Sequence, residues 1–447
     1  MHSERATTSE DHRLQQDANR ESNWKRWGPY LSERQWGTVR EDYSADGSAW
    51  DYFPHEHARA RAYRWGEDGL LGFTDRQCRL CFALALWNGR DRMLKERLFG
   101  LTGPQGNHGE DVKECYYFLD GTPTHSYMRA LYKYPQRAFP YERLVAENAA
   151  RTRAEPEFEL VDTDAFADGR YFDVFVEYAK ASSEDVLVRV TIANRATESA
   201  DIAVLPTLWF RNTWSWGRGG EEHGPEPAIE QVGDAALRTR HDTLGRYELA
   251  FGAGPRGGAP ELVFTNNESN RAQLWNAPNT TPFTKDAFHA YVVDGRADAV
   301  NPLRRGTKAA AVYRLNIPAR GEVVLRMRLA ANDGGSLVAL GRNFDELVDL
   351  RRDEADEFFA ARMPKAFSVE QRRVVRQSYA GLLWSKQFYH YVVRDWLEGD
   401  PAQPAPAPER KLARNHEWTH LYNRDVISMP DTWEYPWYAA WDLAFHM

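Results

Sequence analysis

The feature that most constrains the fold is a long series of strand-like segments between about residues 63 and 330. In YFDVFVEYAK (171–180) and VLVRVTIANR (186–195), apolar and polar residues alternate, and only a short polar stretch separates the two segments. Alternation with a period of two is typical of half-buried antiparallel strands. This pair of segments therefore predicts a β-hairpin.

Further segments continue the same pattern along the chain. They are CFALALWNG (81–89), DIAVLPTLWF (201–210), RYELAFG (246–252) and ELVFTN (261–266). The stretch 309–330 predicts a second hairpin, with its turn between Pro318 and Gly321. Many strands of similar length, separated by Gly, Pro, Asn and Asp, favour a large antiparallel β-sandwich.

After Asn332 the apolar residues recur with the period of a helix instead. FDELVDLRRDEADEFFAARM (344–363) predicts a charged linker helix. Ser368 and Gln371 form a capping box, and the apolar spacing that follows predicts a helix reaching about Leu397. The helical part of the chain therefore begins where the strand pattern ends.

Two shorter patterns complete the chain. PAQPAPAP (401–408) predicts a proline-rich loop that cannot be helical, and AAWDLAFHM (439–447) looks like the start of another helix. One long helix and the start of another cannot bury their apolar faces alone, so we expect the helical domain to be incomplete in this chain. The resulting fold class is α+β and multidomain. The expected parts are a polar N-terminal tail (1–22), a β-sandwich (23–332), a linker helix (333–366) and the first part of a helical domain (367–447).

Charge and hydropathy exclude several classes of partner. The formal net charge is −8, which provides no basic surface for nucleic acid. No apolar run is long enough to cross a membrane, and the polar first 23 residues do not resemble a secretory signal. We therefore expect a cytoplasmic protein with neither nucleic acid nor a membrane as partner.

The three cysteines do not indicate a metal site. Cys78 and Cys81 have the spacing of half a zinc site, but no second pair or matching histidine pair accompanies them. Reduced cysteines in or near strands explain the spacing better. We expect no cofactor and no metal in the chemistry of this chain.

The last segment, WEYPWYAAWDLAFHM, places six aromatic residues between Trp433 and Phe445 around two carboxylates, Glu434 and Asp442. Aromatic rings pack against the C–H faces of sugars, and cleavage of a glycosidic bond needs carboxyl groups. Burial among aromatics would raise the pKa of Asp442, as a general acid requires, whereas a helix N-terminus would lower it. An Asp that caps a helix beneath an aromatic cluster explains the same residues.

The same segment, with its aromatic–Asp–x–x–Phe–His ending, resembles the general-acid segment of glycoside hydrolase family 63. Residues 23–53 (NWKRWGPY to DYF) and 96–128 (ERLFGLTG to HSYM) also resemble bacterial members of that family. The family includes the processing α-glucosidases and the mannosylglycerate and glucosylglycerate hydrolases. The resemblance implies an N-terminal antiparallel β-sandwich followed by an (α/α)6 toroid, of which this chain holds only the start.

The resemblance also implies a reaction and a substrate class. Members invert the anomeric configuration with an Asp as general acid and a Glu as base, and Asp442 matches the acid. The matching Glu lies outside this chain, so we expect the chain alone to be inactive and to need the remainder of its own polypeptide. The expected protein is an inverting, exo-acting α-glycosidase that hydrolyses α-linked glucosides, mannosides or related oligosaccharides.

The residues expected to contact the carbohydrate come from three segments. They are Trp433, Glu434, Trp437, Tyr438, Trp441, His108, Glu110 and Trp36. Arg34, Arg40 and Asp42 are expected to be hydrogen-bonding neighbours of Trp36. Packing at a domain edge explains Trp36 equally well, and a solvated polar loop explains residues 107–114.

Two other functions fit the same sequence. One is a non-catalytic carbohydrate-binding module, which would show sugar affinity without turnover. The other is a different toroid glycosidase, similar to trehalase or glucoamylase, which would differ in substrate rather than in mechanism.

Overall fold

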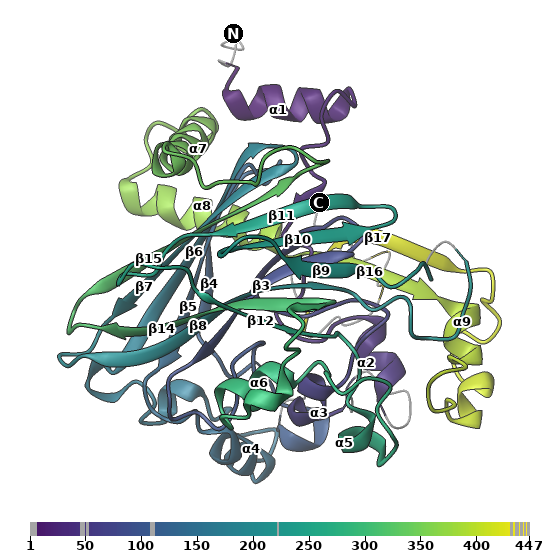
Figure 1. Cartoon of the computed structure of the whole chain (residues 1–447). Coiled ribbons are helices and arrows are strands. Elements are labelled where there is room, and N and C mark those ends of the chain that lie inside the picture. Colours follow the sequence, from purple (N-terminus) through teal and green to yellow (C-terminus); the bar gives the residue numbers. More distant parts are fainter. Residues whose placement is uncertain are drawn as a thin grey trace.

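The alternating segments form two antiparallel β-sheets that pack face to face (Figure 1). The computed structural model describes residues 7–44, 50, 53–107, 112–220, 223–429, 432–433, 438, 441 and 444. Within those ranges every pairing between the named strands is antiparallel. The expected β-sandwich is therefore confirmed.

The strands are distributed unequally between the two sheets. One sheet has the order β1 (Trp27–Gly28), β2 (Leu70–Asp75), β3 (Leu80–Trp87), β8 (Ala200–Phe210), β14 (Lys308–Ile317) and β12 (Glu261–Thr265). The other has the order β13 (Arg305–Gly306), β9 (Ala228–Gln231), β10 (Ala236–His241), β11 (Gly245–Phe251), β15 (Glu322–Ala331), β7 (Asp185–Asn194), β6 (Tyr171–Ser182), β5 (Tyr127–Pro135) and β4 (Tyr116–Gly121). We call them the six-stranded and the nine-stranded sheet.

Of the two hairpins predicted from the sequence, one is confirmed and one is wrong. Strands β6 and β7 pair along their length, from Phe172 with Asn194 to Ser182 with Asp185. Strands β14 and β15 occur where the sequence placed them, but β14 pairs with β8 and β12, and β15 pairs with β7 and β11. The turn between them crosses from one sheet to the other, because alternation specifies the buried face of a strand but not its neighbour.

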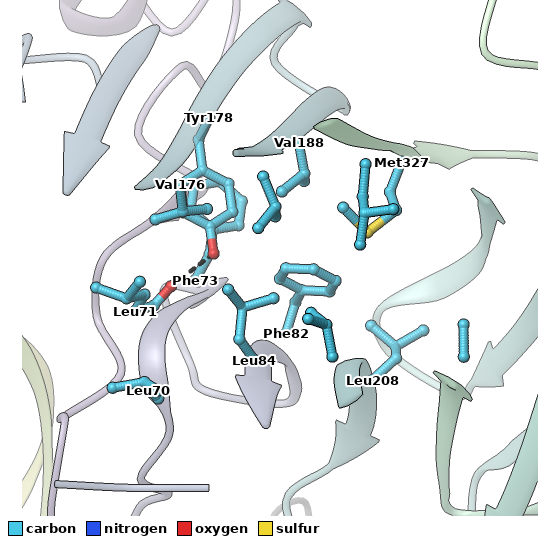
Figure 2. Packing of buried hydrophobic residues seen from close by; sticks show 14 of the residues in the cluster. Leu70, Leu71, Phe73, Phe82, Leu84, Val176, Tyr178, Val188, Leu208 and Met327 are labelled. Atoms are coloured by element: carbon cyan, nitrogen blue, oxygen red, sulfur yellow. Dashed lines mark hydrogen bonds between the residues drawn. The ribbon is translucent and has the colours of Figure 1, made fainter. Parts of the chain in front are cut away.

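The main hydrophobic core lies between the two sheets (Figure 2). Phe73 of β2 stacks on Tyr178 of β6, with ring centroids 4.7 Å apart. The Tyr178 hydroxyl donates a hydrogen bond to the Leu71 carbonyl oxygen at 2.6 Å, so the buried polar atom is satisfied (Figure 2). Each such fully buried large side chain stabilises the fold by about 1.5–3 kcal/mol.

The N-terminal residues differ from the expected polar tail. Residues Ser9–Ala18 form α1, which begins with a capping box between Thr8 and Asp11. The Glu10 side chain is fully buried and accepts hydrogen bonds from Thr124 N and Ser126 Oγ, each at 2.7 Å. The polar N-terminal segment therefore contains a helix, which one buried carboxylate with matched donors anchors to the sandwich.

Two longer helices pack against the nine-stranded sheet, α7 on its outer face and α8 at the edge strand β4 (Figure 1). Helix α7 (Phe344–Ala360) matches the predicted linker helix and packs Phe344 and Val348 against Tyr127 and Leu187. Helix α8 (Val369–Trp384) begins with the predicted capping box at Ser368. At its end Trp384 stacks on Phe118 of β4, with ring centroids 5.0 Å apart.

The prediction that α8 reaches Leu397 is wrong. The helix ends at Trp384 and is followed by β16 (Lys386–Val392) and the short helix α9 (Val393–Glu398). Strand β16 pairs with β17 (Tyr422–Ser428) along its whole length. The sequence FYHYV inside β16 is aromatic and β-branched, which favours a strand once a partner is present. Residues 401–407 form the predicted non-helical loop.

Short helices fill the loops between the strands. They are α2 (Thr38–Tyr43), α3 (His55–Ala60), α4 (Tyr141–Ala149), α5 (Arg271–Trp275) and α6 (Ala287–Val292), with single 3₁₀ turns at Gly103–Gln105, Leu160–Asp162, Ala167–Gly169, Ala297–Ala299 and Pro408–Leu412. In α6, Phe288 packs on Leu205 and Ala310 and covers the outer face of the six-stranded sheet. Among the described residues, no helix is both long and apolar enough to span a membrane.

Candidate functional site

Residues 30–44 connect the sandwich to the two-stranded sheet formed by β16 and β17. The Phe388 N–H donates to the Tyr30 carbonyl oxygen at 2.9 Å, and the Thr38 hydroxyl donates to the His390 carbonyl oxygen at 2.8 Å. These contacts fix α2 against β16. The N-terminal motif of the sequence therefore lies beside a segment more than three hundred positions further along the chain.

An aromatic cluster forms where α2 meets β16. We use this name for Trp36, Tyr389 and Tyr438. Trp36 meets Tyr389 edge to face at 5.5 Å, and Tyr438 stacks on Tyr389 at 5.4 Å. Trp36 is 6% exposed and Tyr389 is 3% exposed, whereas Tyr438 is 38% exposed. Trp36 and Tyr389 are therefore the buried members of the cluster, and Tyr438 is the member whose side chain is partly open to solvent.

Two buried arginines lie next to this cluster. Arg34 and Arg40 are 1% and 0% exposed. Burial lowers the pKa of Arg34 to about 9, partly opposed by the charge of Asp68. Burial lowers the pKa of Arg40 well below its usual value, and the charge of Arg34 lowers it further. Two neighbouring guanidinium groups in a low-dielectric setting produce a strong local field that favours electron-rich groups.

Trp433 is the contact point of three sequence segments. The Arg34 guanidinium lies 5.5 Å from the centre of the Trp433 ring, within cation–π range. Arg40 Nη1 lies 3.5 Å from the carbonyl oxygens of Thr432 and Trp433. The Trp433 indole N–H donates to the Tyr116 hydroxyl at 3.3 Å. Residues from the segments 23–53, 96–128 and 433–446 therefore meet at one place.

Carboxyl groups flank the arginines on the same segment. Glu33 is 6% exposed, and burial raises the pKa of its carboxyl to about 7. Burial also raises the pKa of Glu41, which forms an ion pair with Arg414 at 3.1 Å. A carboxyl group that titrates near neutral pH can both accept and release a proton. This part of the chain therefore combines buried cations, aromatic rings and buried carboxyl groups.

A second polar region, the ionic cavity, lies on the outer face of the six-stranded sheet. We use this name for the space of about 20 Å³ whose charged lining residues are Glu67, Asp68, Glu96, Arg97, Lys285 and Lys308. Arg97 Nε lies 3.0 Å from both carboxylate oxygens of Asp68, and Lys308 donates to Glu96 at 2.7 Å. The volume suffices for one water molecule, so we assign the ionic cavity a structural role.

Burial and pairing shift the ionisation of groups in the ionic cavity. Burial alone would raise the pKa of Glu96, but the charges of Lys308 and Arg97 hold it at about 2. Burial lowers the pKa of Lys285 to about 8, partly opposed by Glu67 and Asp68. Three carboxylates face three cations here, and this balance reduces the cost of burying them.

The structure places some of the predicted site residues and not others. Trp433 lies against Arg34, Trp36 and Tyr438 lie against Tyr389, and Trp441 is 73% exposed. The others lie outside the described residues. They are Asp442, Glu434, Trp437, His108 and Glu110.

The described end of the loop 107–114 is buried. Lys113 forms ion pairs with Glu157 at 2.8 Å and Glu159 at 2.9 Å. Glu114 accepts hydrogen bonds from Lys95 at 2.5 Å and from the Phe99 N–H at 2.7 Å. These two residues therefore anchor the loop to the sandwich.

Sequence reasoning missed Tyr116, Tyr389 and Glu33. Tyr389 was assigned to a helix, and only pairing between β16 and β17 places it beside Trp36. Glu33 carries no sequence signal, because its raised pKa results from burial by segments distant in the chain. Trp27 and Tyr30, from the same segment as Trp36, are 0% and 4% exposed and belong to packed clusters.

Comparison with known proteins gives one strong sequence match. No family model matches the chain. An uncharacterized protein of Saccharomyces cerevisiae is 46% identical over an alignment 479 positions long. The alignment covers 98% of this chain and 44% of the relative. The chain therefore spans less than half the length of the curated relative it matches.

The similarity to solved structures is weak. The chain is similar to the family GH92 α-mannosidase of Bacteroides thetaiotaomicron with 11% identity and a TM-score of 0.28, covering 84% of this chain and 43% of the mannosidase. It is similar to a polysaccharide lyase with 11% identity and a TM-score of 0.26, covering 57% of this chain and 26% of the lyase. Similarity at this level establishes neither family nor activity.

Proposed function

We propose that this chain is part of a carbohydrate-active enzyme, an inverting exo-acting α-glycosidase that hydrolyses α-linked glucosides or mannosides. One observation carries the proposal. The three segments that resemble glycoside hydrolase family 63 are far apart in the sequence, yet Arg34, Tyr116 and Trp433 each come from a different one and contact one another through Trp433. Unrelated packing would not be expected to bring together the segments of one motif set.

In the proposed mechanism Asp442 donates a proton to the glycosidic oxygen as the bond breaks. A Glu outside this chain activates the water that attacks the anomeric carbon from the opposite face. The partly exposed ring of Tyr438 provides an aromatic surface for the sugar. Trp433 provides a second ring, which contacts Arg34 and donates a hydrogen bond to Tyr116. Arg34, buried against the Trp433 ring, and Arg40, beside the Trp433 carbonyl, would provide positive charge that orients sugar hydroxyls without solvent reorganisation.

The experiment that tests the proposal uses the longest natural polypeptide that contains this sequence. We expect it to hydrolyse α-glucosides or α-mannosides and to release the β-anomer first, as followed by proton NMR. Asp442→Asn should lower kcat by about 10²–10⁴-fold on substrates with poor leaving groups, because the general acid is lost. Substrates with good leaving groups should be affected much less.

The matched control is Asp353→Asn, whose side chain is 69% exposed on α7 and should leave turnover unchanged. Release of the α-anomer first would contradict the inverting mechanism. Sugar binding without turnover of any α-glycoside would contradict the enzyme and support a carbohydrate-binding module.

We further propose that α8 belongs to a larger helical domain of the same polypeptide, an α/α toroid. On the face opposite the buried Ala380 and Trp384, apolar side chains are exposed: Val374 at 65%, Tyr379 at 48% and Leu382 at 41%. Further helices would bury this face, and the relative is long enough to supply them. Amide hydrogen exchange in 369–384 should be slower in the longer polypeptide than in this chain. Equal exchange rates would contradict this assignment.

A further inference from the structure

An open groove, which we call the Arg61 groove, lies at the C-terminal end of α2. Its volume is about 230 Å³, more than ten times that of the ionic cavity. One wall is formed by Tyr43 and Arg61 and a second by Trp275, and the proline-rich loop 403–407 forms the third. At ~30 Å³ per water molecule, the space holds about seven waters or one small organic molecule.

Arg61 is the charged group in this groove whose donors are not used. Its guanidinium makes no hydrogen bond or ion pair with any of the residues that the structure describes. It lies 4.0 Å from the centre of the Tyr43 ring and 5.3 Å from that of Trp275. Its backbone is held by its N–H bond to the His57 carbonyl and by the Lys285 ammonium, which donates to the Arg61 carbonyl at 2.7 Å.

The carboxylates of the groove do not neutralise Arg61, because other groups already hold them. Asp42 accepts a hydrogen bond from the Trp65 indole N–H at 2.7 Å and forms an ion pair with Arg410. Asp400 forms an ion pair with Arg64 and accepts a hydrogen bond from Arg218 Nε at 3.1 Å. Among the described residues, Arg410 of the lining therefore has an ion-pair partner and Arg61 has none.

The arrangement of Arg61 suits recognition of a planar or tetrahedral anion. The guanidinium N–H donors lie in the plane of the group, so a ring stacked on its face leaves those donors available to a ligand. Carboxylate and phosphate oxygens match that fork in a bidentate contact. The aromatic rings of Tyr43 and Trp275 also restrict the side chain before any ligand arrives, which lowers the entropy lost on binding.

We propose that the Arg61 groove is a binding site for a small organic anion, a carboxylate or a phosphate ester, with Arg61 as its bidentate donor. The neighbouring rings and the proline-rich loop would enclose the uncharged body of the ligand. This inference is independent of the proposed glycosidase activity, because it uses none of the residues assigned to that reaction. It therefore stands or fails separately.

The test is calorimetric titration of this chain with glucose 6-phosphate, glucuronate and glucose at constant ionic strength. The two anions should bind, whereas glucose, which has the same ring without the charge, should bind at least about tenfold more weakly. A preference for glucose 6-phosphate would identify a phosphate ester as the ligand class, and a preference for glucuronate a carboxylate. Equal binding of all three sugars, or no binding of either anion, would overturn the proposal.

Two variants locate the binding to the groove. Arg61→Gln should weaken anion binding by about tenfold to a hundredfold, because a charged hydrogen-bond pair is lost. Arg256→Gln is the matched control, since Arg256 is an exposed arginine in a turn outside the groove and should leave binding unchanged. Equal affinity of Arg61→Gln and the unaltered chain would overturn the assignment.

A measurement on the unaltered protein covers the case in which Arg61→Gln does not fold. Phenylglyoxal modifies accessible arginines, and peptide mapping reports which of them react. The bound anion should protect the peptide that contains Arg61 while modification of Arg256 continues at the same rate. Modification of Arg61 at an unchanged rate in the presence of a saturating anion would overturn the proposal.

Discussion

The ionic cavity and the Arg61 groove contain the same kinds of side chain but use them differently. In the ionic cavity three carboxylates and three cations share about 20 Å³, and Arg97–Asp68 and Lys308–Glu96 form ion pairs. In the Arg61 groove the acids are paired and one guanidinium is left facing about 230 Å³ of open space. A closed space requires charge balance, because water cannot enter to solvate an unpaired charge. An open space can retain an unpaired charge that is available to a ligand.

The largest expected difference between the two regions is in stability. Lys308→Met removes the cation that donates to Glu96 and leaves a buried carboxylate without its main partner. We expect a loss of about 3–5 kcal/mol in the free energy of unfolding, measured by urea denaturation. The matched control is Lys365→Met at an exposed position, which should change the free energy by less than about 0.5 kcal/mol. Equal effects of the two substitutions would show that Lys308 does not stabilise the buried carboxylate of Glu96.

The dependence of folding stability on pH should also reflect the ion pairs of the ionic cavity. The pKa of Glu96 is held at about 2 in the fold, below its usual value of 4.5. Its contribution is therefore complete above pH 4.5 and is lost as the pH falls towards 2. The shift corresponds to about 3 kcal/mol. Glu96→Gln should flatten the stability curve over this range in urea titrations at several pH values. An unchanged slope would mean that Glu96 is not held ionised by its partners.

Asp400, at the edge of the Arg61 groove, should make the stability of the fold depend on pH in the opposite direction. Burial raises its pKa to about 6, against the attraction of Arg64 and Arg218. A raised pKa favours folding below the unfolded value of 3.8, and this contribution is lost as the pH rises through about 6. Asp400→Asn should therefore reduce the decrease in stability across that interval. If the free energy of unfolding of the variant falls more steeply as the pH rises, the pKa of Asp400 is not raised in the fold.

The smallest expected effect is that of Arg61 on folding. Because its guanidinium has no ion pair among the described residues, Arg61→Gln should cost only the contact with the Tyr43 and Trp275 rings. We expect about 0.5–1 kcal/mol from urea denaturation, far below the effect of Lys308→Met. A loss as large as that of Lys308→Met would show that Arg61 is a structural residue like those of the ionic cavity.

The sequence predicted local features well where one pattern was sufficient. Alternation identified β6, β7, β8 and β14, and the capping box at Ser368 marked the start of α8. The predictions that were wrong concern partners. β14 and β15 look like a hairpin but lie in different sheets, and the segment after Trp384 becomes a strand because β17 pairs with it.

The candidate site divides in the same way. The sequence by itself determined the strand-rich character of the chain, the polar loops and the motif segments that contain Arg34, Tyr116 and Trp433, because these depend on residue type and short-range spacing. Only the tertiary structure decided that the three side chains meet, that Glu33 titrates near neutral pH, and that Arg61 faces open space. Burial, pKa and pairing are set by groups distant in the chain, and spacing along the sequence does not encode which of them will be neighbours.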